Sequence, residues 1–113
     1  LVSGVLENTL AEFSNPAEVS VWLGPCIGAE AFEVGPEVRQ QFCGQNPLAV
    51  DCFKSAEGDK YLANIYGLAR LALSSPRVDI YGGEFCTYSD DKYFYSYRRD
   101  GITGRMATII WIE

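Results

Sequence analysis

The residues best suited to chemistry in this sequence are a cysteine in a glycine- and proline-rich turn and three arginines in a short loop. Cys26 lies in LGPCIG, directly after the apolar run VSVWL. A thiol at a strand end can line a cleft, and a positively charged neighbour would lower its pKa and make it reactive. The other interpretation is a buried structural cysteine in a tight turn. We favour that interpretation because the sequence offers the thiol no base partner.

The three arginines, Arg98, Arg99 and Arg105, fall in YRRDGITGR. Asp100-Gly101 within this stretch is a strong turn signal. Planar guanidinium groups suit a phosphate or a carboxylate, and the glycines allow close backbone approach, so the loop could bind an anion. Alternatively, the loop is a hairpin whose arginines pair with nearby acidic residues, and the residues alone do not separate the two interpretations. Those acidic residues are Glu84, Asp90, Asp91 and Asp100.

A cluster of aromatic residues precedes the arginines and could stack a planar ligand. Such a cluster more often forms part of a core and a half-exposed sheet, and we favour that interpretation unless the arginine loop forms a pocket. The cluster consists of Tyr88, Tyr93, Phe94, Tyr95 and Tyr97.

The sequence contains no histidine. A Ser-His or Cys-His pair and a histidine-ligated metal site therefore cannot be built from this chain alone. The four cysteines, at positions 26, 43, 52 and 86, have no C-x2-C spacing, so a zinc knuckle is not expected. An even number permits two disulfides. We favour four reduced thiols in a cytoplasmic protein, because no secretory signal is recognisable.

The length and the net charge of the chain limit the classes of protein to which it can belong. The chain has 113 residues, which predicts one domain over residues 1–113. The formal net charge of −6 argues against general binding to nucleic acid or to an anionic membrane. No apolar run approaches the roughly 20 residues of a membrane span.

The elements that must position these residues can be predicted from hydrophobic spacing and turn signals. Apolar residues at helical spacing predict helices, Asn15-Pro16 ends the first of them, and Pro36 suits a first helical position. Alternating or continuous apolar runs predict strands, the last of them central and buried on both faces. The predicted helices cover residues 2–13, 36–42 and 62–73, the strands cover 19–23, 30–34, 78–81, 93–97 and 106–112, and an extended piece is possible within 43–59.

Irregular interleaving of strands and helices predicts an α+β fold with a mixed β-sheet packed against about three helices. The first helix has no room for an N-terminal cap, and the chain does not begin with methionine. We therefore expect that residues upstream belong to the same fold.

Three stretches together carry a resemblance to a known family: WLGPCIGAEAFEVGPEVRQQF, LANIYGLAR and FCTYSDDKYFYSYRRDGITGRMATIIW. The chain resembles, over essentially its whole length, the C-terminal half of the laccase-domain family, also described as polyphenol oxidase-like or multicopper polyphenol oxidoreductases. The resemblance implies the C-terminal portion of a larger single-domain fold. It also implies a zinc-dependent (formerly copper-assigned) enzyme that phosphorolyses purine nucleosides and can deaminate adenosine.

The family's metal ligands are two histidines and a cysteine of the upstream half, so the resemblance implies no metal ligand and no cofactor within this chain. Its segments matching LGPCIG and the arginine loop lie near the active cleft. It therefore implies a pocket-wall role for Cys26, and anion positioning or loop support for Arg98, Arg99 and Arg105. No catalytic residue is assigned.

The function implied is that of a portion of a purine nucleoside phosphorylase that is inactive without its upstream half. The complete protein would take a purine nucleoside and phosphate. One alternative is a non-catalytic module that self-associates as a homo-oligomer through exposed apolar surface. Another is an anion- or nucleotide-binding domain that uses the arginine loop.

Overall fold

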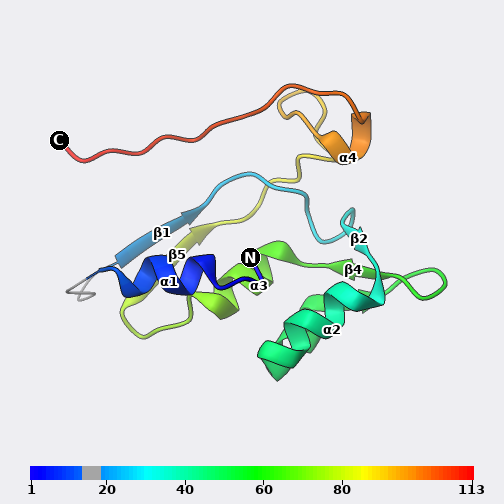
Figure 1. The fold of residues 1–113 in the computed structure, drawn as a ribbon. Coiled ribbons are helices and arrows are strands. Elements are labelled where there is room, and N and C mark those ends of the chain that lie inside the picture. The colour runs from blue at the N-terminus through cyan, green and yellow to red at the C-terminus, as the bar shows by residue number, and fades with distance from the viewer. Residues whose placement is uncertain (14–18) are drawn as a thin grey trace.

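The structure is a computed structural model that describes residues 1–13 and 19–113. The predicted helix end at Asn15-Pro16 lies outside the described residues. Figure 1 shows the arrangement of the elements. In chain order they are α1 (Val5–Ala11), β1 (Val19–Leu23), β2 (Glu33–Val34), α2 (Pro36–Gln45), a 3-10 helix (Pro47–Cys52), β3 (Phe53–Ser55), β4 (Tyr61–Ala63), α3 (Ile65–Ala72), β5 (Val78–Gly82) and α4 (Tyr97–Asp100).

β1 and β5 form a parallel pair that runs in register from Val19 opposite Val78 to Leu23 opposite Gly82. Residues along both strands alternate between half-buried and exposed, which is the period of two that a strand imposes. A parallel pair needs a long crossover connection, and here the crossover contains α2, α3 and the second sheet.

The second sheet is antiparallel, in the order β2-β4-β3. The α2 helix begins at Pro36, whose fixed φ suits a first helical position, and it packs against the 3-10 helix. The rings of Phe42 on α2 and Phe53 on β3 lie 6.0 Å apart between centroids, so this helix is tied to the second sheet.

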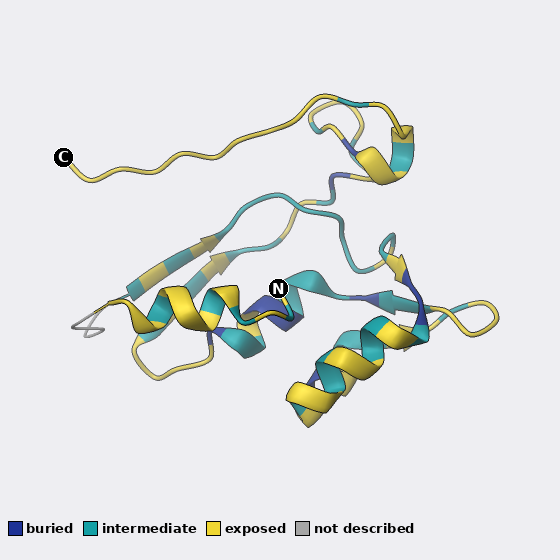
Figure 2. Ribbon diagram, viewed as in Figure 1, coloured by how far each residue is buried: buried dark blue, intermediate teal, exposed yellow. Residues whose placement is uncertain are grey.

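The small core is centred on the junction between β4 and α3. Ala63 at the end of β4 is 0% exposed, and Figure 2 shows the darkest burial on α3 and around β2 and β4. The Asn64 side chain caps α3 by accepting a hydrogen bond from the N–H of Gly67 at 2.9 Å. The buried apolar residues are Val34, Ala49, Ala63, Leu68, Ala69 and Leu73.

The predicted α+β class is confirmed, and strands pair in both parallel and antiparallel directions. The predicted strands at 19–23 and 78–81 and the predicted helix at 36–42 are present as β1, β5 and α2. The helix predicted over 62–73 was wrong at its start, because Tyr61–Ala63 pairs with β2 and β3 and the helix begins only after the Asn64 cap.

The two strands predicted near the C-terminus were wrong in this structure. Residues 91–93 form a turn, and Ser96 caps the short helix α4 by accepting from the N–H of Arg99, so the alternating tyrosines do not pair as a strand. Residues 106–112 form an extended segment that runs back from α4 above β1 and pairs with no other described strand (Figures 1 and 2). Trp111 and Ile112 are 72% and 98% exposed, which is the reverse of the predicted central burial.

No helix in residues 1–13 and 19–113 combines the length and the apolar character that crossing a membrane requires.

Candidate functional site

The carboxyl ends of β1 and β5 separate at a pair of glycines and meet again at two cysteines. Past Leu23 and Gly82 the chains rejoin in a parallel bridge between Cys26 and Cys86. Residues 24–25 on one side oppose 83–85 on the other, so the β5 side carries an extra residue, as in a β-bulge. Gly82 (φ +83°) and Gly83 (φ +92°) adopt the left-handed backbone that this bulge requires.

Two side chains one turn apart on α3 hold these strand ends. The Tyr66 hydroxyl accepts a hydrogen bond from the N–H of Cys26 at 2.9 Å and donates to the carbonyl of Phe85 at 2.6 Å. The Arg70 guanidinium donates to the carbonyls of Ile80 and Gly82, at 3.3 and 2.7 Å. The helix therefore fixes both chains that lead to the cysteine bridge.

The two thiols of the bridge have different environments. Burial raises the pKa of the Cys26 thiol, and this effect exceeds the opposing hydrogen bond with Tyr66. Burial also acts on Cys86, but hydrogen bonds from Ser89 and from the backbone N–H of Gly28 outweigh it and lower the pKa of that thiol. The Gly28 N–H lies 3.1 Å from the Cys86 sulfur. Cys86 is therefore the more readily ionised of the pair.

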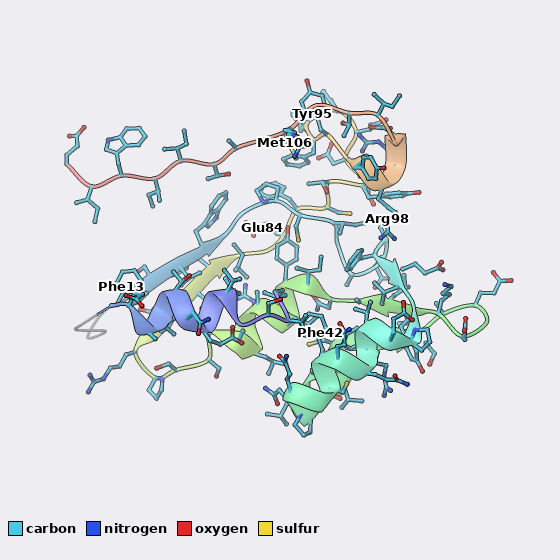
Figure 3. All side chains as sticks on the ribbon, viewed as in Figure 1. Phe13, Phe42, Glu84, Tyr95, Arg98 and Met106 are labelled. Atoms are coloured by element: carbon cyan, nitrogen blue, oxygen red, sulfur yellow. The ribbon has the colours of Figure 1, made fainter. Side chains whose placement is uncertain are left out.

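An open pocket of about 380 Å³ lies beside this bridge. It combines an amide (Asn64), a phenol (Tyr66), a thiol (Cys86) and a carboxylate (Glu84, labelled in Figure 3). Such convergent polar groups in a concave site suit a small polar ligand. Its lining consists of Gly28, Ala29, Asn64, Tyr66, Gly67, Arg70, Gly83, Glu84, Phe85 and Cys86.

Arg99 is fully occupied by contacts within its own loop. Its guanidinium donates to the carbonyls of Thr87 (2.8 Å), Tyr88 (3.0 Å) and Phe94 (2.9 Å). It also forms a two-point contact with the carboxylate of Asp100, at 3.0 and 2.9 Å. The family resemblance implied either anion positioning or loop support for this arginine. These contacts favour loop support.

The other two arginines lie in different surroundings. Arg98 donates to the carbonyl of Glu33 at 2.8 Å and stacks over the ring of Phe32, 5.2 Å from its centroid. Arg105 is exposed and lines a separate open pocket of about 460 Å³ together with Tyr95 and Met106, which lie near one another in Figure 3. The three guanidinium groups therefore do not converge on one anion in this structure.

We predict that Arg99→Met lowers the thermal unfolding midpoint by several degrees, because it leaves three carbonyls and the Asp100 carboxylate without their donor. Arg105→Met is the matched control, since it removes the same charge from the same segment. The control should shift the midpoint by less than a degree or so, as a surface substitution does. Equal shifts in the two variants would show that the contacts of Arg99 are dispensable.

The donor set of this chain does not fit the zinc or copper that the resemblance implies for the complete protein. Within residues 1–13 and 19–113, no three side chains of the His, Cys, Asp and Glu types come together as metal ligands. Cys26 and Cys86 offer two thiols, whereas zinc sites take three or four protein ligands. A metal centre would therefore need ligands other than the described residues.

The sequence predicted Cys26, which lies beside this pocket without lining it, and it gave no indication of Cys86, Tyr66, Arg70 or Asn64, which do line it. One local signal was available, because Tyr66 and Arg70 are four residues apart and must share a face of any helix. The pairing of Cys86 with Cys26 had no local signal, since it depends on the register of β1 against β5.

Comparison with known proteins places this chain in a family. The profile of the family described as multi-copper polyphenol oxidoreductase laccase matches residues 1–113. The purine nucleoside phosphorylase YfiH of Escherichia coli is 52% identical over 118 residues, covering 99% of this chain and 46% of the relative. The purine nucleoside phosphorylase PA4543 of Pseudomonas aeruginosa is 47% identical over 116 residues, covering 100% of this chain and 48% of its own length.

Solved structures agree with the sequence comparison. A crystal structure of a Neisseria meningitidis protein superposes with a TM-score of 0.83 at 45% identity, covering 88% of this chain and 42% of that protein. The chain thus spans about half the length of the relatives it matches, and the match falls in their C-terminal half. On the match of the family profile to the whole chain, this protein belongs to the multi-copper polyphenol oxidoreductase laccase family.

Proposed function

We propose that this chain is the C-terminal portion of a purine nucleoside phosphorylase whose complete form takes a purine nucleoside and phosphate. The observation that carries the proposal is the 52% identity to the Escherichia coli purine nucleoside phosphorylase over 99% of this chain. Because the chain spans about half of that relative, the activity is proposed for the complete protein.

The proposed share of this chain in the reaction is to build one wall of the nucleoside pocket. Tyr66 and Arg70 hold the strand ends beside the pocket of about 380 Å³, and the backbone of Cys26 is fixed there by Tyr66. Cys26 is kept as a proposed wall residue. Arg98 and Arg105, both exposed, are kept as candidates for positioning an anion, and Arg99 as a candidate for loop support.

Catalytic groups would come from residues outside the chain. The sequence has no histidine, and its described residues hold no ligand cluster for a metal. The zinc or copper, and the adenosine deamination, that the family resemblance implies are accordingly proposed for the complete protein only. A cytoplasmic location is proposed as well, and it is supported by the four cysteines, all of which are free thiols in the structure.

A chimera tests the proposal. The segment of the Escherichia coli relative that matches this chain is replaced by the 113 residues, and release of hypoxanthine from inosine is measured with and without phosphate. We expect phosphate-dependent release at a rate comparable with that of the intact relative, because about half of the exchanged residues are identical.

The controls for this experiment are the intact relative and the relative truncated before the exchanged segment. A chimera that is soluble and folded by circular dichroism, yet releases no base when phosphate is added, would contradict the proposed function. The truncated relative should be inactive, which shows that the exchanged segment is required.

A further inference from the structure

Cys26 and Cys86 lie on neighbouring chain segments just past the ends of β1 and β5. They are direct partners in the parallel bridge beyond β1 and β5. Neighbouring strands lie about 4.7–4.9 Å apart, and disulfide-bonded cysteines have Cα separations of about 4.4–6.8 Å. Because directly paired residues project to the same face of a sheet, rotation of the side chains can bring the two sulfurs together, and the Cys26 thiol then leaves the carbonyl of Ile27, to which it donates at 3.4 Å.

The surroundings of the pair leave room for sulfur chemistry. Gly28 presents only its N–H to the Cys86 sulfur, at 3.1 Å, and a Cβ at this position would lie 3.2 Å from that sulfur and 3.0 Å from the Cys86 Cβ. A larger residue would therefore crowd the thiol, whereas glycine supplies a donor that favours the thiolate. The thiolate is the form that attacks a disulfide.

A reagent can reach Cys86, because this residue lines the open pocket of about 380 Å³, whereas Cys26 lies behind it and does not line the pocket. Tyr66, which lines the same pocket, holds the N–H of Cys26 at 2.9 Å and so fixes the second cysteine beside the first. The other two cysteines differ in position. Cys43 lies within α2 and Cys52 ends the 3-10 helix, so they are not paired across strands, although Cys43 is near enough to help raise the pKa of Cys52.

We propose that Cys26 and Cys86 form a thiol–disulfide exchange site that reacts with a small disulfide such as oxidised glutathione and closes to an intramolecular disulfide. In the first step the Cys86 thiolate attacks one sulfur of the reagent. A Cys86–glutathione disulfide forms, and one glutathione thiolate leaves and takes up the proton that Cys86 lost. Next, Cys26 loses its proton and attacks the Cys86 sulfur, and the second glutathione leaves as a thiol. Two cysteines are oxidised and one glutathione disulfide is reduced to two thiols.

The test uses the 113-residue chain with its natural cysteines. It is incubated with oxidised glutathione, the remaining thiols are blocked with N-ethylmaleimide, and the linked peptides are identified by mass spectrometry. We expect one dominant linkage, Cys26 to Cys86, with Cys43 and Cys52 recovered blocked. The oxidised chain should unfold at a temperature about 10 °C higher, because the disulfide closes a long loop.

Two variants make the test specific. Cys26→Ser should retain glutathione on Cys86, because the resolving thiol is absent. Cys43→Ser/Cys52→Ser is the matched control, and it should form the linkage as rapidly as the natural chain. Linkages spread over all cysteine pairs, or a mixed disulfide on Cys86 that the natural chain never resolves, would overturn the proposal.

Discussion

Replacing Gly82 with alanine is expected to lower the free energy of unfolding of this chain by about 3 kcal/mol. Two effects combine at this position. Gly82 has a φ of +83°, which costs an L-residue about 1–2 kcal/mol. A Cβ there would also lie 2.6 Å from the carbonyl oxygen of Leu23, a backbone atom of the paired strand that cannot move without breaking the register.

Gly58 provides a matched control, because it has a similar φ of +66° and nothing within 4 Å of its would-be Cβ. Gly58→Ala carries only the backbone cost, so we expect a loss of about 1 kcal/mol. Both variants are measured by urea unfolding. If the two substitutions reduce stability equally, the close approach of β1 and β5 at their carboxyl ends does not constrain the fold.

The second large effect is expected at Tyr66. Tyr66→Phe removes the hydroxyl that joins α3 to both strand ends and leaves the N–H of Cys26 and the carbonyl of Phe85 without their partner. The N–H of Cys26 is part-buried, while the carbonyl of Phe85 is exposed and can turn to water, so we expect a loss of about 1–2 kcal/mol in urea unfolding. Tyr81→Phe is the control, since the Tyr81 side chain is 58% exposed on the face of β5 and its loss should change stability by less than about 0.5 kcal/mol.

The same hydroxyl predicts a pH dependence. Burial is the largest cause that raises the pKa of Tyr66 to about 12, and the neighbouring thiols of Cys26 and Cys86 add to it. A pKa raised by folding contributes stability that is present below the unfolded value near 10 and is lost as pH rises toward 12. The stability difference between the natural chain and Tyr66→Phe should therefore be smaller at pH 11 than at pH 8. A constant difference across this range would show that ionisation of Tyr66 is not coupled to folding.

The sequence predicted correctly those elements whose signals lie within a few neighbouring residues. Alternation in VSVWL and the flanking glycine and proline were sufficient for β1, and Pro36 marked the start of α2. The β4–α3 boundary was missed, because Leu62 and Ile65 also fit one apolar helical stripe and only pairing with β2 and β3 makes 61–63 a strand. For residues 106–112 the apolar pattern is that of a strand, but a strand needs a partner, and none of the described residues pairs with it.

The candidate site was predicted less completely than the fold. The turn signals around Cys26 predicted a strand end at this residue. Cys86 lies beside it only because of the parallel register of β1 and β5, and Tyr66 lies beside it only because of how α3 packs. The closeness of three arginines in the sequence was a weaker guide to an anion site, because a guanidinium donates equally well to backbone carbonyls. Arg99 donates to the carbonyls of Thr87 and Phe94. The two alternative functions, self-association and the binding of an anion or nucleotide by the arginine loop, stay predictions.

The proposed division of roles is tested most directly by measuring phosphorolysis of inosine by the 113-residue chain alone, compared with the Escherichia coli chimera at equal concentration. This chain is proposed to supply a pocket wall, while the catalytic groups come from residues outside it. The isolated chain should therefore release no hypoxanthine above the phosphate-only background, while the chimera releases it in a phosphate-dependent reaction. Phosphate-dependent release by the isolated chain would contradict the proposal that the catalytic groups lie outside it.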